Sequence, residues 1–288
     1  MWLGIETSSL VSSVALVDET RVIGEITMQA GFTHSEQLVP HIDALFNMTG
    51  KQKSDLTGIV VSTGPGSFTG LRIGMGTAKA MAYALNIPLY GVMTMDGMAY
   101  NLPYSEGIIS VLIDAQKKNV YEARYEWQDN SLICTQLPMV KAAVDLMNEV
   151  VADGHSITFI GDGIKRITKL MPDDTPHIRI APMTATIPKA SSLVLAAMPQ
   201  IEAGETENPM TMVPYYIRRS EAEVVWEEKH KDNVDMLAQN STVIVIETVK
   251  TANVLTSLDD STYIDATNHT GDIAKVSVTT DKTSEVDL

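Results

Sequence analysis

The glycine-rich segment Gly64–Gly74, GPGSFTGLRIG, constrains the fold of this chain more than any other part of its sequence. It follows the short β-branched run 58–62, which is typical of a buried parallel strand, and it leads into an apolar stretch that predicts a helix to about Leu85. A further strand is expected at 87–91. A strand, a tight turn, a helix and a second strand in this order predict an α/β protein.

The residues before this unit fit the same class. Residues 1–26 predict two or three short strands that are joined by hydroxyl-rich and acidic turns. Residues 35–48 predict a helix, because Leu38, Ile42 and Leu45 recur on one face. We therefore expect a first lobe over residues 1–102.

The second half of the chain repeats this order of elements. Strands are expected at 108–113, 120–127, 131–138 and 156–160, and helices at 139–151 and 189–203. The repetition predicts a second lobe over residues 103–232, although no repeat is visible at the level of single residues.

The composition changes after residue 232. Residues 233–288 hold nine acidic residues against three lysines, with no arginine or proline and with frequent threonine. Such a segment is a flexible acidic tail, a small β-rich extension, or a regulatory mask over a basic surface of a partner. The run 241–247 favours one strand, which we expect to add to an open edge of a sheet.

Charge and composition exclude several classes of protein. The net charge of −15 argues against nucleic-acid binding by this chain alone, because phosphate contacts need a basic surface. No apolar run is long enough for a membrane span, and the N-terminus lacks the pattern of a signal peptide, so we expect a cytoplasmic protein. The single cysteine, Cys134, excludes an internal disulfide framework and a multi-cysteine zinc site.

The glycine-rich loop has two interpretations. Gly64, Gly66, Ser67 and Thr69 precede a helix, where free backbone N–H groups can bind an anion. The loop lacks the lysine of a Walker loop and the spacing of a dinucleotide-binding loop. A tight turn that needs glycine for its backbone geometry explains it equally well.

A strip of small residues follows on the predicted helix. The candidate partner-interface residues are Gly70, Gly74, Ala78 and Ala82, which recur every four residues, together with the flanking Met75 and Lys79. Two glycines on one helix face indicate a very close neighbour, since each costs about 1 kcal/mol relative to alanine. We favour a helix of another subunit as this neighbour, and packing within the chain is the alternative.

Candidate catalytic and metal-binding residues are scarce. His34 and His41 are seven residues apart, whereas a chelating pair on a helix needs a spacing of four. Asp114 follows a predicted strand, where an aspartate is either catalytic or fixes a turn. We assign no catalytic residue and no metal ligand.

Four segments together resemble one known family. They are 5–16 (IETSSLVSSVAL), Gly64–Gly74, 111–125 (VLIDAQKKNVYEARY) and 213–226 (VPYYIRRSEAEVVW), and they resemble the TsaB family, also called YeaZ. The resemblance covers residues 1 to about 232. It implies a two-lobed actin/Hsp70/sugar-kinase-like (ASKHA) fold and a role in making threonylcarbamoyladenosine at position 37 of tRNA.

The resemblance also implies partners. Members of the family bind TsaD, the catalytic paralogue, as a heterodimer that a small ATPase, TsaE, joins. They are not enzymes themselves and contact tRNA only through the complex, while ATP and the metal are expected on the partner subunits. Without a partner, a homodimer is expected.

One departure from the catalytic paralogue supports this role. TsaD carries a His-x-x-x-His pair that binds its metal, and the matching stretch here, 92–100, has no histidine. Two alternatives stay open, namely an ATP-dependent kinase or ATPase of the same fold and a metallopeptidase-like protein.

Overall fold

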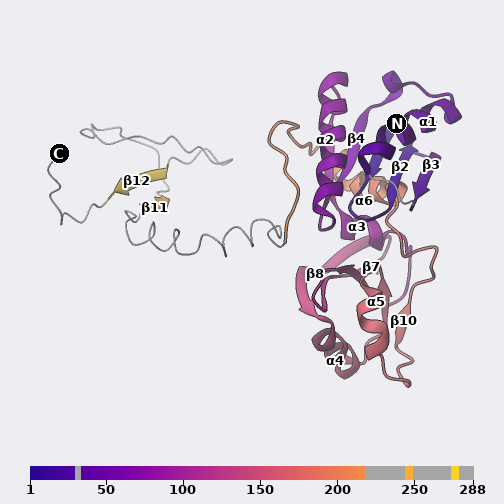
Figure 1. The fold of residues 1–288 in the computed structure, drawn as a ribbon, viewed down its shortest axis with the longest axis vertical. Helices are drawn as coiled ribbons and strands as arrows, with labels where there is room; N and C mark the ends of the chain where they lie inside the picture. Colours follow the sequence, from indigo (N-terminus) through magenta and orange to yellow (C-terminus); the bar gives the residue numbers. More distant parts are fainter. Residues whose placement is uncertain (30–33, 218–243, 249–273, 279–288) are drawn as a thin grey trace. The chain divides into compact units, whose positions relative to one another are not determined.

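The computed structural model describes residues 1–29, 34–217, 244–248 and 274–278 (Figure 1). The chain divides into two units, residues 1–219 and residues 220–288. The first unit contains two mixed sheets with helices around them, which confirms the predicted α/β class.

The first sheet is built mainly from the N-terminal hundred residues. Its strands are β1 (Trp2–Glu6), β2 (Ser12–Val17), β3 (Val22–Met28), β4 (Gly58–Gly64) and β5 (Leu89–Met93), in the order β3-β2-β1-β4-β5. Strands β1, β2 and β3 are antiparallel neighbours, whereas β4 is parallel to both β1 and β5. The glycine-rich loop therefore leaves the sheet at the carboxyl end of a central parallel strand.

The second sheet has the same topology. Its strands are β6 (Ile108–Asp114), β7 (Asn119–Gln128), β8 (Ser131–Ala142), β9 (Ile157–Ile160) and β10 (Ile178–Ile180), in the order β10-β9-β6-β7-β8. Strands β6, β7 and β8 are antiparallel neighbours, and β9 is parallel to both β6 and β10. Two sheets with one shared strand order confirm the predicted two-lobed α/β architecture.

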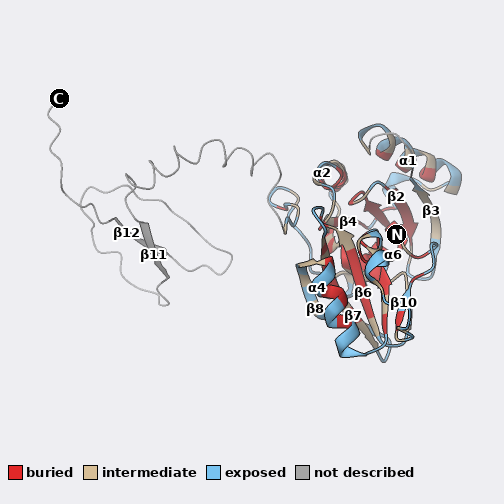
Figure 2. Cartoon of the chain, turned by 60° about the horizontal axis from the view of Figure 1, so that its bottom comes forward, coloured by how far each residue is buried: buried red, intermediate tan, exposed pale blue. Residues whose placement is uncertain are grey.

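Helices cover both faces of the first sheet. Helices α1 (His34–Thr49) and α2 (Phe68–Leu85) pack on one face, where Leu38 and Met75 share a core with Ile59. Helix α6 (Ala190–Ala203) covers the other face through Leu193 and Val194. Figure 2 shows the central strands β4 and β6 largely buried, whereas the edge strand β8 and the outer faces of α1 and α4 are exposed.

The remaining helices are short or belong to the second lobe. They are the 3-10 helix η1 (Lys53–Asp55), α3 (Thr94–Ala99), α4 (Ala143–Asp153), α5 (Ile164–Ile167) and the 3-10 helix η2 (Thr168–Leu170). None of the helices in the described part of the chain has the length and apolarity that crossing a membrane requires.

Three expectations from the sequence are wrong. The helix expected at 139–151 begins only at Ala143, because residues 139–142 pair with β7 as the end of β8. Helix α6, which we expected in the second lobe, packs on the first sheet instead, and residues 218–232 lie outside the described residues. The strand expected at 241–247 is present as β11 (Ile244–Thr248), with 241–243 outside the described residues, but it pairs with β12 (Ala274–Val278) rather than with an open edge of a larger sheet.

Candidate functional site

The glycine-rich loop packs against the turn between β1 and β2. A Cβ atom at Gly66 would collide with the carbonyl oxygen of Ser8, and one at Gly70 would collide with that of Thr7. Gly64 has a φ of +114°, a conformation that glycine adopts most readily. The glycines are therefore needed for close backbone contact between two turns.

The polar groups of this loop form hydrogen bonds with other groups of the same chain. The Ser67 N–H donates to the carbonyl oxygen of Ser8, and the Ser67 hydroxyl caps α2 by accepting from Gly70 N–H at 3.3 Å. The Thr7 hydroxyl donates to the carbonyl oxygen of Gly70 at 2.8 Å. This geometry favours the structural interpretation of the loop. Anion binding near the exposed Thr69 stays a prediction.

The strip of small residues on α2 faces the chain's own sheet. Gly70, Gly74, Ala78 and Ala82 are buried, and a Cβ atom at Gly74 would collide with the Thr7 hydroxyl. Our preferred interpretation of this strip as a contact with another subunit is therefore corrected, because β1 and its turn already occupy it.

The two flanking interface candidates also have partners within the chain. Met75 is buried in the core of the first lobe. Lys79 donates from Nζ to the carbonyl oxygen of Met212 at 2.9 Å, so its ammonium group holds the C-terminal segment 205–217 of the lobe.

A second strip of small residues lies on the outward face of α2. Gly76, Ala80 and Ala84 are exposed, and nothing lies within 4 Å of a Cβ atom placed on Gly76. Tyr83 beside them is 74% exposed. We missed this strip in the sequence although it has the same spacing of four residues, because spacing does not tell which face is buried.

The segment 205–217 runs back along the first lobe beside α2. Its Glu207 N–H donates to Leu89 at 2.8 Å, and its Tyr215 N–H donates to Thr63 at 2.7 Å. The Tyr216 ring stacks on Phe68 with 4.9 Å between ring centroids, and the Arg72 guanidinium lies 3.9 Å from the Phe68 ring centroid. The end of this segment is thus held at the start of α2 by the contact between Tyr216 and Phe68.

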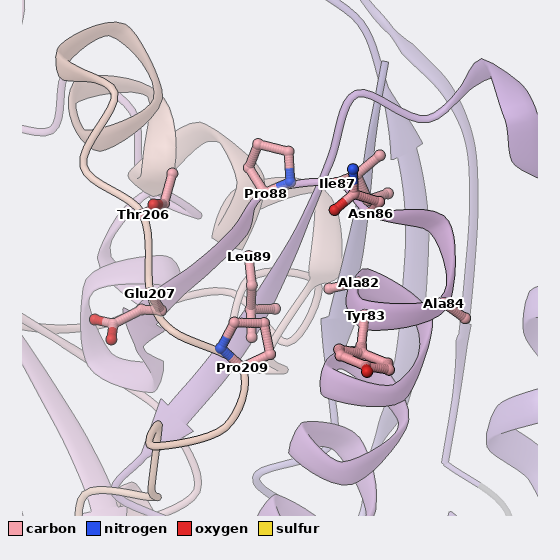
Figure 3. Close-up of a pocket in the computed structure, with 10 residues that line it drawn as sticks. All are labelled: Ala82, Tyr83, Ala84, Asn86, Ile87, Pro88, Leu89, Thr206, Glu207 and Pro209. Carbon is pink, nitrogen blue, oxygen red and sulfur yellow. The ribbon is translucent and has the colours of Figure 1, made fainter.

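An open groove of about 710 Å³ lies at the other end of α2, beside residues 206–209 (Figure 3). Leu89 forms part of its wall, and Tyr83 and Asn86 line it from the helix. The single charged residue in its lining is Glu207, whose carboxylate points away from α2 in Figure 3. The groove therefore presents no candidate nucleophile or metal ligand set.

In the second lobe, Asp114 fixes a turn. Its carboxylate accepts from Arg166 Nε at 2.8 Å, from Arg166 Nη2 at 3.0 Å and from the Gln116 N–H at 2.9 Å, and Lys165 Nζ lies 2.8 Å away. These contacts outweigh desolvation and lower the pKa of Asp114 to about 2. An aspartate held in this way is a structural residue rather than a poised base.

Residues 161–163, a Gly-Asp-Gly segment directly after β9, pack against the same turn. A Cβ atom at Gly161 would collide with the carbonyl oxygen of Leu112, and Asp162 accepts from the Asp114 N–H at 2.9 Å. This segment thus holds the end of β9 against the end of β6.

The stretch 92–100, which contains no histidine, includes helix α3. Its acidic residue, Asp96, accepts from the Tyr125 hydroxyl at 2.7 Å, and burial raises the pKa of Asp96. His34 Nε2 lies 2.6 Å from the carbonyl oxygen of Ser9, and His41 Nδ1 lies 3.2 Å from the Ser12 hydroxyl. Within the described residues, no three His, Cys, Asp or Glu side chains gather as a metal site requires.

Comparison with known proteins identifies the family. The model of the family described as "TsaD: tRNA N6-adenosine threonylcarbamoyltransferase" matches residues 21–226. A Bacillus subtilis protein named "tRNA threonylcarbamoyladenosine biosynthesis protein TsaB" is 30% identical over 234 residues, which cover 80% of this chain and 99% of that protein. The chain belongs to the TsaB family.

Other TsaB-family proteins agree with this assignment. An Escherichia coli protein of the same name is 32% identical over 132 residues, which are 45% of this chain and 57% of that protein. The solved structure "YeaZ from Pseudomonas aeruginosa" has a TM-score of 0.65 and 25% identity over 75% of this chain and 98% of that one. A second structure from that organism is described as an uncharacterized protein with similarity to peptidase YEAZ, with a TM-score of 0.65, 24% identity and 75% and 99% coverage.

One buried acidic residue of this TsaB-family chain escaped the sequence analysis. Glu6, at the end of β1, is 1% exposed, and its Oε1 accepts from the Ser8 N–H at 2.6 Å. Burial raises the pKa of Glu6, and the hydrogen bond from the Ser8 N–H only partly opposes this rise. Its place directly before a hydroxyl-rich turn was the signal that could have identified it.

Proposed function

We propose that the chain is a non-catalytic subunit of the complex that transfers threonylcarbamoyl from threonylcarbamoyl-AMP to N6 of adenosine 37 in tRNAs that read ANN codons. In this role it binds TsaD and stabilises its active shape. The observation that carries the proposal is the likeness to a protein named TsaB over 99% of that protein's length.

The absence of catalytic activity is supported by the site residues. The stretch 92–100, where TsaD is expected to carry its metal-binding histidines, has none. Asp114 is bound by two cationic side chains, and the glycine-rich loop is filled by the turn after β1. A fold without these groups does not by itself imply an activity.

The outward face of α2 is the surface that we propose for TsaD. Gly76, Ala80 and Ala84 leave room for a helix to approach closely, and Tyr83 is exposed beside them. The segment 205–217 adds Met210 at 75% exposure and Val213 at 73%. Exposed apolar side chains on a monomer are typical of interaction sites when they occur together.

The remaining partners follow from the same proposal. TsaE and tRNA bind to the complex rather than to this acidic chain alone, and ATP and the metal are held by the partner subunits. The complex works in the cytoplasm, and a homodimer forms when TsaD is absent.

The deciding experiment is co-purification with TsaD from the same organism, followed by tRNA modification assays with and without this chain. We expect a stable heterodimer, and we expect modification only when both proteins are present. TsaD that modifies tRNA at full rate without this chain would contradict the proposal.

The alternatives need assays of the chain alone. A peptidase deserves a test because one solved relative is described as similar to a peptidase. An ATPase or kinase is the other candidate of this fold. We expect neither peptide cleavage nor ATP hydrolysis above background, and turnover that survives repeated purification would show an enzyme.

A further inference from the structure

Two chain segments connect the lobes, and the side chain of Asn101 forms hydrogen bonds from one segment to the other. Residues 100–107 lead from α3 into β6, and residues 181–189 lead from β10 back to α6. Asn101, in the first connection, donates from Nδ2 to the carbonyl oxygens of Ala185 and Ile187, both at 2.8 Å. Its Oδ1 accepts from the Ser192 hydroxyl of α6 at 2.6 Å.

The lobes also share a core around α3. Met95 and Met98 are 0% and 2% exposed and pack in one cluster with Val111 and Tyr125 of the second sheet. On its other side α3 touches α6, since a Cβ atom at Gly97 would lie 2.9 Å from a methyl carbon of Leu193. Helix α3 is thus wedged between a helix of the first lobe and the sheet of the second.

Polar and aromatic contacts hold the first connection on β7. The Asp96 carboxylate accepts from the Tyr125 hydroxyl at 2.7 Å, and Trp127 Nε1 donates to the carbonyl oxygen of Leu102 at 2.8 Å. The Trp127 ring contacts those of Tyr100 and Tyr104, with centroids 5.5 Å and 4.9 Å away. Residues 100–104 of this connection are therefore held against β7.

Hinge motion between lobes needs connecting residues that can change their backbone angles freely. Here such a change would break the three Asn101 hydrogen bonds and expose the methionines of α3. We propose that Asn101 latches the two connections and that the lobes keep one arrangement instead of opening and closing around a ligand. This inference goes beyond the proposed function and does not depend on it.

The test measures the distance between the lobes in the full chain. Spin labels are placed at Met48→Cys on α1 and Val144→Cys on α4, which are 80% and 51% exposed, in a Cys134→Ser background. Labelled chains are diluted with unlabelled ones, so that pairs between molecules do not contribute. We expect one narrow distance distribution that does not change when ATP and Mg²⁺ are added.

Asn101→Ala should broaden this distribution and speed hydrogen exchange in residues 100–107 and 181–189 roughly tenfold or more, because it removes three hydrogen bonds that join the two connections. The matched control is Asn130→Ala, an exposed asparagine in the turn between β7 and β8, which should leave both readouts unchanged. Should Asn101→Ala not fold, Ser192→Ala, which removes one of the three bonds, decides in its place through the same two readouts.

Two results would overturn the inference. The first is a wild-type distribution with two peaks, or one that shifts with ATP and Mg²⁺, because the lobes would then move. The second is a wild-type distribution and exchange pattern that the latch variants reproduce, because Asn101 would then not be the latch.

Discussion

Arg166 holds the carboxylate of Asp114 with two hydrogen bonds, one from Nε at 2.8 Å and one from Nη2 at 3.0 Å. The arrangement joins α5 to the end of β6, and Lys165 adds a third cationic contact to the same carboxylate. Charge-assisted pairs of this geometry are among the stronger polar contacts in proteins.

Asp114→Asn should lower the free energy of unfolding by about 1–2 kcal/mol at pH 7, because it removes hydrogen bonds to a charged group. The carboxylate has its pKa lowered to about 2 from an ordinary 3.8, so its stabilising effect is present above pH 3.8 and is lost as the pH falls through about 2. Urea unfolding at pH 7 and at pH 2 measures this. A difference between variant and wild type that is equally large at both pH values would contradict it.

Glu6→Gln should have the opposite pH dependence. Burial raises the pKa of Glu6 above 4.5, so its favourable contribution is complete below that pH and is lost as the pH rises through the folded-state pKa. The variant should therefore gain stability relative to wild type between pH 4 and pH 8. Denaturant titrations across this range test the sign, and a constant difference would show that Glu6 does not titrate abnormally.

Two glycines of α2 form a matched pair. Gly74→Ala should destabilise the chain by about 1–3 kcal/mol, since its Cβ atom would collide with the Thr7 hydroxyl. Gly76→Ala should stabilise it by about 0.5–1 kcal/mol, because its outward position is open and alanine favours a helix. Thermal unfolding of both variants distinguishes them, and equal shifts in one direction would refute the assigned faces.

Ala80→Glu tests the proposed TsaD surface. A charge placed in a close helix contact should weaken TsaD binding at least about tenfold, while the melting temperature stays within about 2 °C because the position is exposed. The control is Val144→Glu, an exposed apolar position on α4 of the second lobe. Titration calorimetry with TsaD gives the comparison, and unchanged affinity for Ala80→Glu would move the interface elsewhere.

Two truncations test where the functional part ends. A chain that stops at Asp232 should keep both lobes folded and bind TsaD as the full chain does, with changes only in solubility or self-association. A chain that stops at Gly204 should lose about 2–5 kcal/mol, because it removes the buried Met212 and the hydrogen bonds of Glu207 and Tyr215. Loss of TsaD binding in the longer truncation would place residues 233–288 in the interface.

The sequence predicted the helices and strands better than the tertiary contacts that they make. The period of Leu38, Ile42 and Leu45 places one face of α1 in the core, as the structure confirms. Periodicity also marked the strip that begins at Gly70, but it could not tell whether the neighbour was a partner helix or the turn after β1. That choice depends on residues more than sixty positions apart, which no local pattern connects.

The boundary between β8 and α4 failed for a related reason. Met139, Val140 and Ala142 have apolar side chains that suit a helix as well as a strand, and only the pairing of this segment with β7 decides for the strand. The latch at Asn101 was equally invisible, because its partners lie 84, 86 and 91 residues away.

The return of α6 to the first sheet affects the order in which the two lobes complete their folding during synthesis. The second lobe is continuous between residues 108 and 180, whereas the first lobe receives Leu193, Val194 and Met212 from the far side of it. Domains fold as units during synthesis, and the part with the longer-range contacts is completed later. The lobe that is translated first is therefore the last to complete its core, and until α6 has been made one face of its sheet stays uncovered.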